Sequence, residues 1–191
     1  VINGSTDNDG ICAWVIPDLI SSNVRVRAMD VNDTDAYSIS QNYFKIKGSF
    51  NVSSPASGER LPIGYNTTLR WNTTGNISRV KIVAYSSLGA NDTRFGYTPA
   101  SPYTINADYS ANVGNGQTNY AWMAPDNATA YAKIRVIDYN DSTVLADSSG
   151  NFSLIGSFNV TSPNGGQAWT VGTAQNITWV PTGSSITEAR V

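Results

Sequence analysis

The chain contains no histidine, one cysteine and two glutamates among its 191 residues. Without histidine, it lacks the side chain that most often serves as a general base or a metal ligand near neutral pH. A single cysteine, Cys12, excludes an intrachain disulfide. There is also no nucleophile elbow, phosphate-binding loop or metal-binding motif. We therefore expect no enzymatic activity, no catalytic residue, no cofactor and no bound metal.

Charged residues are scarce as well, at 14% of the chain, and asparagine, serine and threonine take their place. The formal net charge is −2, and the lysines and arginines are scattered. This composition predicts neither nucleic acid nor an anionic membrane as a partner. No apolar run approaches the ~18 residues of a membrane span, and no signal peptide begins at Val1. We expect an already processed or excerpted piece of a longer protein.

The main feature present is a duplication. GSFNVSSP begins at Gly48, and GSFNVTSP begins at Gly156. We call the separation of these two glycines along the chain the repeat offset. The same offset relates Trp14 to Trp122, Pro17 to Pro125, Asp18 to Asp126, Arg27 to Arg135, Gly64 to Gly172, Trp71 to Trp179 and Gly75 to Gly183. The repeat predicts three units: the late strands of a first repeat in residues 1–47, a complete repeat in 48–155, and the early strands of a third in 156–191.

Each unit is composed of short runs in which apolar and polar residues alternate, as in half-buried strands. In residues 23–31, for example, Val24, Val26 and Ala28 share one face. Similar runs occupy residues 11–18, 43–52, 65–71, 79–85, 119–126, 132–139 and 151–155, separated by turns, and no stretch has a helical period. The expected fold class is all-β, with about seven strands per sandwich and two partial sandwiches flanking a complete one.

The repeats are joined with almost no linker. One junction passes through Gly48 and Ser49, and the other through Gly156 and Ser157. So short a connection leaves little rotational freedom, and we expect a stiff rod whose assembly contacts include these four residues. The partial units are expected to leave strand edges that are covered by more of a tandem array or by the half-domain of a neighbouring chain.

The string SPNGGQAWTVGTAQNITWV (residues 162–180) resembles an Ig-like extracellular repeat of microbial surface proteins, whose pattern is S-P-N-G-G-E-x-W-x-x-G followed by apolar, polar and tryptophan positions. The matching residues are Ser162, Pro163, Asn164, Gly165, Gly166, Trp169, Gly172, Ile177 and Trp179. Gln167 replaces the usual glutamate, and the preceding copy has Leu61 at the tryptophan position. The resemblance covers nearly the whole chain except residues 86–118. It implies an Ig-like β-sandwich at the cell surface, used as a spacer, adhesive or assembly module, without enzymatic activity.

Sequons for N-glycosylation are abundant. Twelve sequons occur: Asn3, Asn32, Asn51, Asn66, Asn72, Asn76, Asn91, Asn127, Asn140, Asn151, Asn159 and Asn176. With serine and threonine as common as they are here, chance would give roughly 4. Two interpretations are open. Polar residues at i and i+2 on the outer face of a strand create sequons without selection, and glycans would also solubilise a surface with so little charge.

Two acidic turns, DVNDTD (residues 30–35) and DYNDS (138–142), offer oxygen ligands for Ca²⁺. An EF-hand would need glycine and glutamate where Asp35 and Gln41 stand, so we favour turns whose side chains cap their own backbone. The strand tryptophans are expected in sandwich cores rather than on a sugar-stacking platform. Cys12 is expected to be a small buried residue; pairing with another chain is the alternative.

The stretch 92–120 is rich in tyrosine, glycine and asparagine, a composition typical of binding surfaces. Tyr97 and Tyr103 in this stretch, and Trp169 in a loop-like stretch, are our candidates for surface contacts. The expected function is structural: a segment of an extracellular, glycosylated filament at the cell surface, whose partners are copies of itself and covalent glycans. The alternative is a cell-surface adhesin or a carbohydrate-binding stalk module.

Glycosylation makes a direct prediction for the mass of the native material. The bare polypeptide has a mass of 20.4 kDa. Each occupied sequon adds the mass of one glycan, so intact-mass spectrometry should give a heavier, heterogeneous species that collapses toward the polypeptide mass on enzymatic deglycosylation. A native mass equal to that of the bare chain would contradict the expectation.

Overall fold

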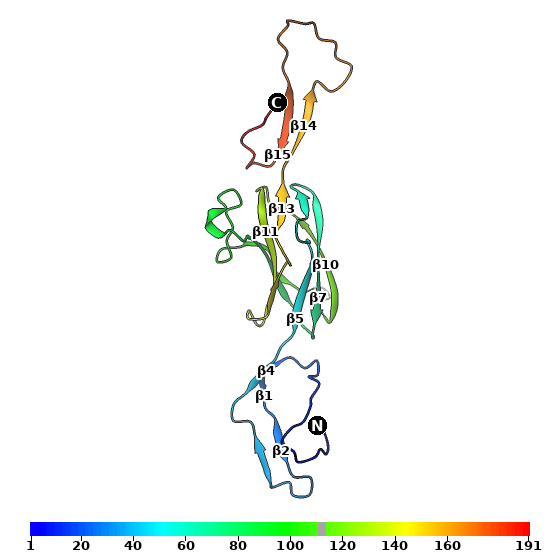
Figure 1. Cartoon of the computed structure of the whole chain (residues 1–191), viewed down its shortest axis with the longest axis vertical. Helices are drawn as coiled ribbons and strands as arrows, with labels where there is room; N and C mark the ends of the chain where they lie inside the picture. The colour runs from blue at the N-terminus through cyan, green and yellow to red at the C-terminus, as the bar shows by residue number, and fades with distance from the viewer. Residues whose placement is uncertain (111–113) are drawn as a thin grey trace.

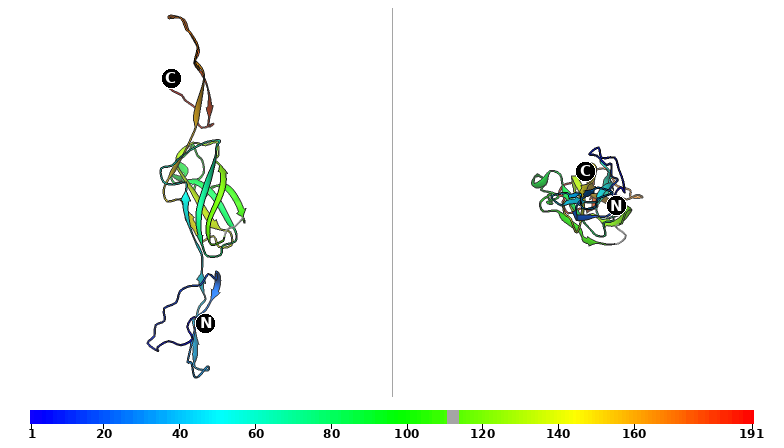
Figure 2. Two further views of the ribbon diagram at one scale, coloured as in Figure 1. Left: turned by 90° about the vertical axis from the view of Figure 1, so that its right-hand side faces the viewer. Right: turned by 90° about the horizontal axis from the view of Figure 1, so that it is seen from below.

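The computed structural model describes residues 1–110 and 114–191, and it is an elongated molecule in which three bodies follow one another along a single axis (Figures 1 and 2). We call residues 48–155 the central unit, residues 1–47 the N-terminal segment and residues 156–191 the C-terminal segment. Nearly all regular structure is β-strand. In the described part of the chain the one helical element is a short 3₁₀ turn, η1 (Gly89–Asn91).

The central unit is a sandwich of two β-sheets. The smaller sheet has the order β10-β7-β5, and the larger has the order β6-β13-β11-β8-β9 with β12 paired to β11. In chain order these strands are β5 (Ser49–Ser54), β6 (Arg60–Pro62), β7 (Asn66–Thr74), β8 (Val80–Ser86), β9 (Tyr103–Tyr109), β10 (Gly116–Met123), β11 (Thr129–Asp138), β12 (Leu145–Asp147) and β13 (Phe152–Ile155). The neighbours are antiparallel except β13 and β6.

The core of the sandwich follows from the alternation along each strand. On β7, Leu69 and Trp71 are fully buried, whereas Arg70 and Asn72 between and beside them are exposed. Strand β8 lies inside the larger sheet and is buried along nearly its whole length. The strand tryptophans of the central unit are core residues as expected; Trp122, for example, is 4% exposed and packs edge-on against Phe152 with ring centroids 6.3 Å apart.

The flanking segments contain only pairs of strands. In the N-terminal segment, β1 (Ser21–Val24) pairs with β4 (Phe44–Ile46) and β2 (Arg27–Met29) pairs with β3 (Tyr37–Ile39). In the C-terminal segment, β14 (Ser157–Ser162) pairs with β15 (Thr178–Thr182). None of these pairs is covered by a second sheet in the described part of the chain.

Strand registers recur at the repeat offset. Val52 lies opposite Trp71, and Val160 lies opposite Trp179. At the other end of the chain, the pair Ser21 and Ile46 corresponds to Thr129 and Leu154, and the pairing of β2 with β3 corresponds position by position to that of β11 with β12. The flanking segments therefore have the same local backbone pairing as the matching parts of the central unit.

Burial, by contrast, does not repeat. Val52 is 4% exposed, but its counterpart Val160 is 47% exposed; Ile63 is 3% exposed, but Val171 is fully exposed. Cys12 is exposed too, so our expectation of a buried cysteine is wrong. The reason is the same throughout: these residues occupy core positions of a sandwich, but the flanking segments have no second layer to cover them.

The structure also corrects the strand predictions. The described residues of the central unit form nine strands, whereas we expected about seven. Strand β9 lies in the stretch 86–118, to which the sequence assigns no alternating run, and the short β6 and β12 are not expected from the alternation. The predicted run at residues 11–18 forms no strand. Its residues 11–15 correspond to 119–123 of β10, and the strand that pairs with β10, β7, has no counterpart in the N-terminal segment.

The contrast between matching tryptophans predicts a difference in stability. Replacing Trp71 by alanine should lower the free energy of unfolding of the central unit by about 3–5 kcal/mol, because it leaves a cavity in the core. The matched variant Trp179→Ala, at a half-exposed position of the same repeat pattern, should leave the unfolding midpoint in denaturant nearly unchanged. Equal losses in both variants, measured by circular dichroism, would contradict this account of the core.

Candidate functional site: the joints between units

The chain passes from one unit to the next at two joints, each formed where a last strand continues into a first strand. At the first joint, Lys47 and Gly48 separate β4 from β5; at the second, Gly156 alone separates β13 from β14. Figure 1 shows both connections as short extended segments on the long axis of the molecule. The geometry of these few residues therefore determines the angle between adjacent units.

Close packing around a glycine characterises both joints. A Cβ atom on Gly48 would lie 2.6 Å from the carbonyl oxygen of Thr74, and one on Gly156 would lie 2.5 Å from that of Thr182. Such distances are too short for any side chain, so the backbone of one strand touches the end of its neighbour directly. The isoleucines that follow, Ile77 and Ile186, pack against the same two glycines.

The neighbouring glycines serve the same joints. Gly75 and Gly183 both adopt positive φ, at 90° and 114°, a conformation that glycine adopts without strain. A Cβ on Gly75 would lie 3.1 Å from the Cα of Gly48, and one on Gly183 would lie 3.5 Å from that of Gly156. Beside each joint, two glycine backbones of the following unit are thus in contact.

One hydrogen bond between units is the same at both joints. The carboxylate of Asp18, from the N-terminal segment, accepts the backbone N–H of Asn76 at 2.7 Å. The carboxylate of Asp126, the counterpart of Asp18 in the next repeat, accepts the backbone N–H of Ser184 at 2.9 Å. A charged acceptor strengthens such a hydrogen bond. Each bond holds the loop that follows Gly75 or Gly183 against the preceding unit.

The second joint carries further polar contacts. The hydroxyl of Ser184 donates to the carbonyl oxygen of Asp126 at 2.9 Å, and the backbone N–H of Ala128 donates to the hydroxyl of Ser185 at 2.8 Å. The guanidinium of Arg94 reaches the carbonyl oxygen of Ser185 at 3.4 Å. Together these bonds connect the C-terminal segment to two separate loops of the central unit.

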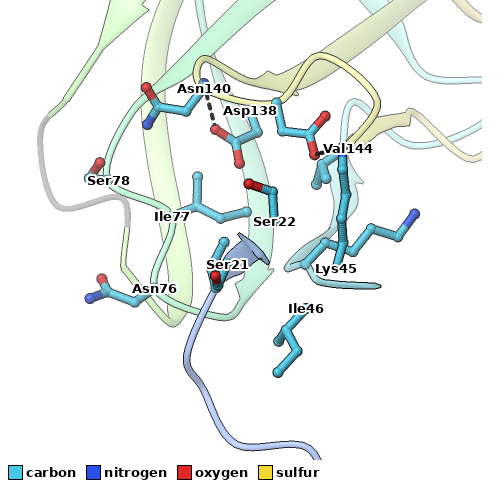
Figure 3. A pocket seen from close by; sticks show the side chains of 13 residues that line it. Ser21, Ser22, Lys45, Ile46, Asn76, Ile77, Ser78, Asp138, Asn140 and Val144 are labelled. Carbon is cyan, nitrogen blue, oxygen red and sulfur yellow. Dashed lines mark hydrogen bonds and ion pairs between the residues drawn. The ribbon is translucent and has the colours of Figure 1, made fainter. Parts of the chain in front are cut away.

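A cleft of about 480 Å³ lies at the first joint. Its walls come from both units: Ser21 and Ile46 from the N-terminal segment, and Ile77, Asp138 and Val144 from the central unit (Figure 3). The backbone N–H of Asn140 donates to the buried carboxylate of Asp138. The cleft is walled by hydroxyl, amide and aliphatic groups together with the charged side chains of Lys45, Lys47, Asp138 and Asp141.

An ion pair crosses this cleft between Lys45 and Asp141, with Nζ and Oδ2 3.3 Å apart. Hydrogen bonds from the hydroxyl and the backbone N–H of Thr143, and then Lys45, hold the pKa of the Asp141 carboxylate below its ordinary value. The pair is solvent-exposed and contributes little to stability on its own. It adds a charge contact to the glycine and aspartate contacts of the first joint.

The predicted contact residues divide into two groups. Gly48, Ser49, Gly156 and Ser157 all lie at the joints. The aromatic candidates lie elsewhere: Trp169 is 43% exposed in a loop, whereas Tyr97 and Tyr103 are half-buried against the core of the central unit, with ring centroids 5.1 Å apart. That these residues bind a partner stays a prediction.

The sequon asparagines are all accessible. Ten are exposed and two, Asn127 and Asn151, are half-buried. The side-chain amide of Asn127 donates to the carbonyl oxygen of Arg94, so it is engaged within the fold. On β7, Asn72 faces solvent while Thr73 points into the core. In this arrangement, polar residues at i and i+2 on the outer face of a strand create a sequon.

The acidic turns cap their own backbone, as predicted. The carboxylate of Asp30 accepts the backbone N–H of Asn32 at 2.7 Å, and that of Asp138 accepts the N–H of Asn140 at 2.8 Å. Within residues 1–110 and 114–191, no three acidic, histidine or cysteine side chains gather in a way that could hold a metal ion. Across the same ranges, no helix is long and apolar enough to span a membrane.

Comparison with known proteins gives no further guidance. No protein-family model matches the chain, and the comparison with curated proteins found no match. The sequence repeat relates Asp18 to Asp126, but it does not single them out as joint residues. Their partners lie 58 residues away in each case, so only the folded structure brings them together.

The repeated aspartate bond predicts the stiffness of the joints. In Asp18→Ala, the first joint loses its charged acceptor, so small-angle X-ray scattering should report a broader distribution of maximum dimensions than for the unmodified chain. Asp9→Ala is a matched control, because the Asp9 carboxylate bonds locally, to the backbone N–H of Ile11. A scattering profile for Asp18→Ala identical to that of the control would contradict the role assigned to this bond.

Proposed function

We propose that this chain is a structural segment of an extracellular, glycosylated filament, built from tandem Ig-like β-sandwiches that are joined nearly end to end. Its activity is mechanical: it transmits load and sets the spacing and direction of successive units. The segment acts through its joints and its outer surface rather than through a catalytic centre.

The observation that carries this proposal is the repetition of the joint. Both joints, which are related by the repeat offset, use the same pair of contacting glycines and the same aspartate bond. A flexible tether would not need the aspartate bond, since its units would move independently. A bond repeated across both joints instead holds each of these units in the same orientation relative to the one before it, which is the requirement for a regular rod.

The exposed apolar faces of the flanking segments support assembly by completion of sandwiches. The C-terminal segment presents the early-strand core positions, such as Val160 and Ile177, and the N-terminal segment presents late-strand positions such as Val26. In the central unit the counterparts of these residues pack together in one core. We propose that each face is covered by the complementary strands of the same repeat pattern, supplied by an adjoining repeat or by a neighbouring copy.

The surface composition supports the proposed extracellular setting. All twelve sequon asparagines are at least partly exposed, and only 14% of the residues are charged. Glycans would supply the hydration that charge supplies on most soluble proteins. The Ig-like classification itself rests on the sequence resemblance, together with the two-sheet core that contains Trp71 and Trp122.

Electron microscopy of the native material tests the proposal. We expect unbranched filaments of uniform width, with an axial repeat equal to the length of one unit, because each joint holds its units at one fixed angle. Isolated particles that are retained on a glycan column would contradict the proposal and favour the adhesin alternative.

A further inference from the structure

The free edge of β10 differs from every other sheet edge of the central unit. Strand β10 forms one side of the smaller sheet and pairs with β7 over eight successive residues without a bulge. Its sequence, GQTNYAWM, contains no charged residue and no proline. Its other side pairs with no strand among the residues that the structure describes.

Sheet edges are normally protected against pairing with another chain by shortness, charge, proline or bulges. The remaining edges of this sandwich show those devices. Strands β6 and β12 have three residues each, and β6 includes Arg60 and Pro62. Strand β9 pairs irregularly and carries Asp108, and β5 has a bulge after Val52, which also bridges to Ser148. An edge that lacks all of these devices is a ready template for an added strand.

Neither β9 nor β10 contains a predicted glycan position. The longest stretch without a sequon runs from Asn91 to Asn127, and it contains both β9 and β10. The sequons of the adjacent strand, Asn66 and Asn72 on β7, lie on the outer face of the sheet rather than at its edge. Glycans at these positions would thus leave the β10 edge itself free for protein contact.

We propose that the β10 edge is the lateral contact between rods, at which a second copy of this chain adds its own β10 in antiparallel orientation. This inference rests on the proposed filament and names the contact between its rods. Because β10 carries no charge, self-pairing places no like charges opposite each other, whichever register is adopted. Centred on Tyr120, such pairing would set Asn119 opposite Ala121 of the other copy and join the two smaller sheets into one.

The side chains along this edge suit a contact of this kind. Gln117, Asn119 and Ala121 are exposed on the outer face, and Met123 at the end of the strand is 56% exposed. On the core side, Tyr120 packs against Tyr109 with ring centroids 5.0 Å apart, which fixes the edge in place before a partner arrives. A rigid edge loses little conformational entropy when a strand is added.

The test compares full-length variants at matched concentrations. In Ala121→Lys, a charge enters the edge, and sedimentation should show association weakened at least tenfold, because pairing would bring two lysines near each other in a desolvated contact. Leu145→Lys is the matched control: Leu145 is also exposed, on the short edge strand β12 of the other sheet, and its association should match the unmodified chain. Asn119→Lys, at another exposed edge position, should repeat the effect of Ala121→Lys.

Hydrogen exchange provides the second measurement. Amides of residues 117–123 should become more protected as the concentration of the unmodified chain rises, and this gain should vanish in Ala121→Lys. Undiminished association in both edge variants, or equal losses in Leu145→Lys, would overturn the proposal. Filaments of normal width in Ala121→Lys would overturn the lateral contact while leaving the proposed filament intact, whereas absence of filaments in native material would remove the proposed function itself.

Discussion

The elongated structure depends on the contacts made at its joints. The last strand of one unit leads directly into the first strand of the next, and inside that next unit no side chain fits where Gly48 meets the end of β7 or where Gly156 meets the end of β15. The aspartate before each joint then bonds to the loop beyond it. With the connection this short, orientation is set by packing and hydrogen bonding between units rather than by a linker, and the elongated shape in Figure 2 follows from that.

The chain contains the repeat both as a complete unit of two sheets and, in the flanking segments, as pairs of strands alone. Strand registers are the same in both, which means that local pairing does not require the second sheet. Burial requires it: Val52 is covered by the opposite layer, whereas Val160 is not. Exposed apolar area is unfavourable in water. On our proposal, further strands cover the flanking segments, and the β10 edge provides a lateral contact in addition.

The sequence predicted the period, the position of the joints and the strands with clear alternation, such as β7 and β11, because these depend on local pattern. It did not predict β9, whose residues lie among glycine, proline and asparagine that normally indicate loops. It did not identify Asp18 or Asp126 as joint residues, because each contact spans a distance that only the tertiary fold closes. We expected Cys12 to be buried because we assumed a complete core around it, whereas it is exposed.

The central claim is that each joint holds adjacent units at one angle. Double electron–electron resonance measures this directly between spin labels at Ser38→Cys on β3 and Leu145→Cys on β12, in a Cys12→Ser background; both labelled positions are exposed. The account predicts a single narrow distribution of distances. A broad or multimodal distribution would show that the units move independently, and it would contradict the rigid rod.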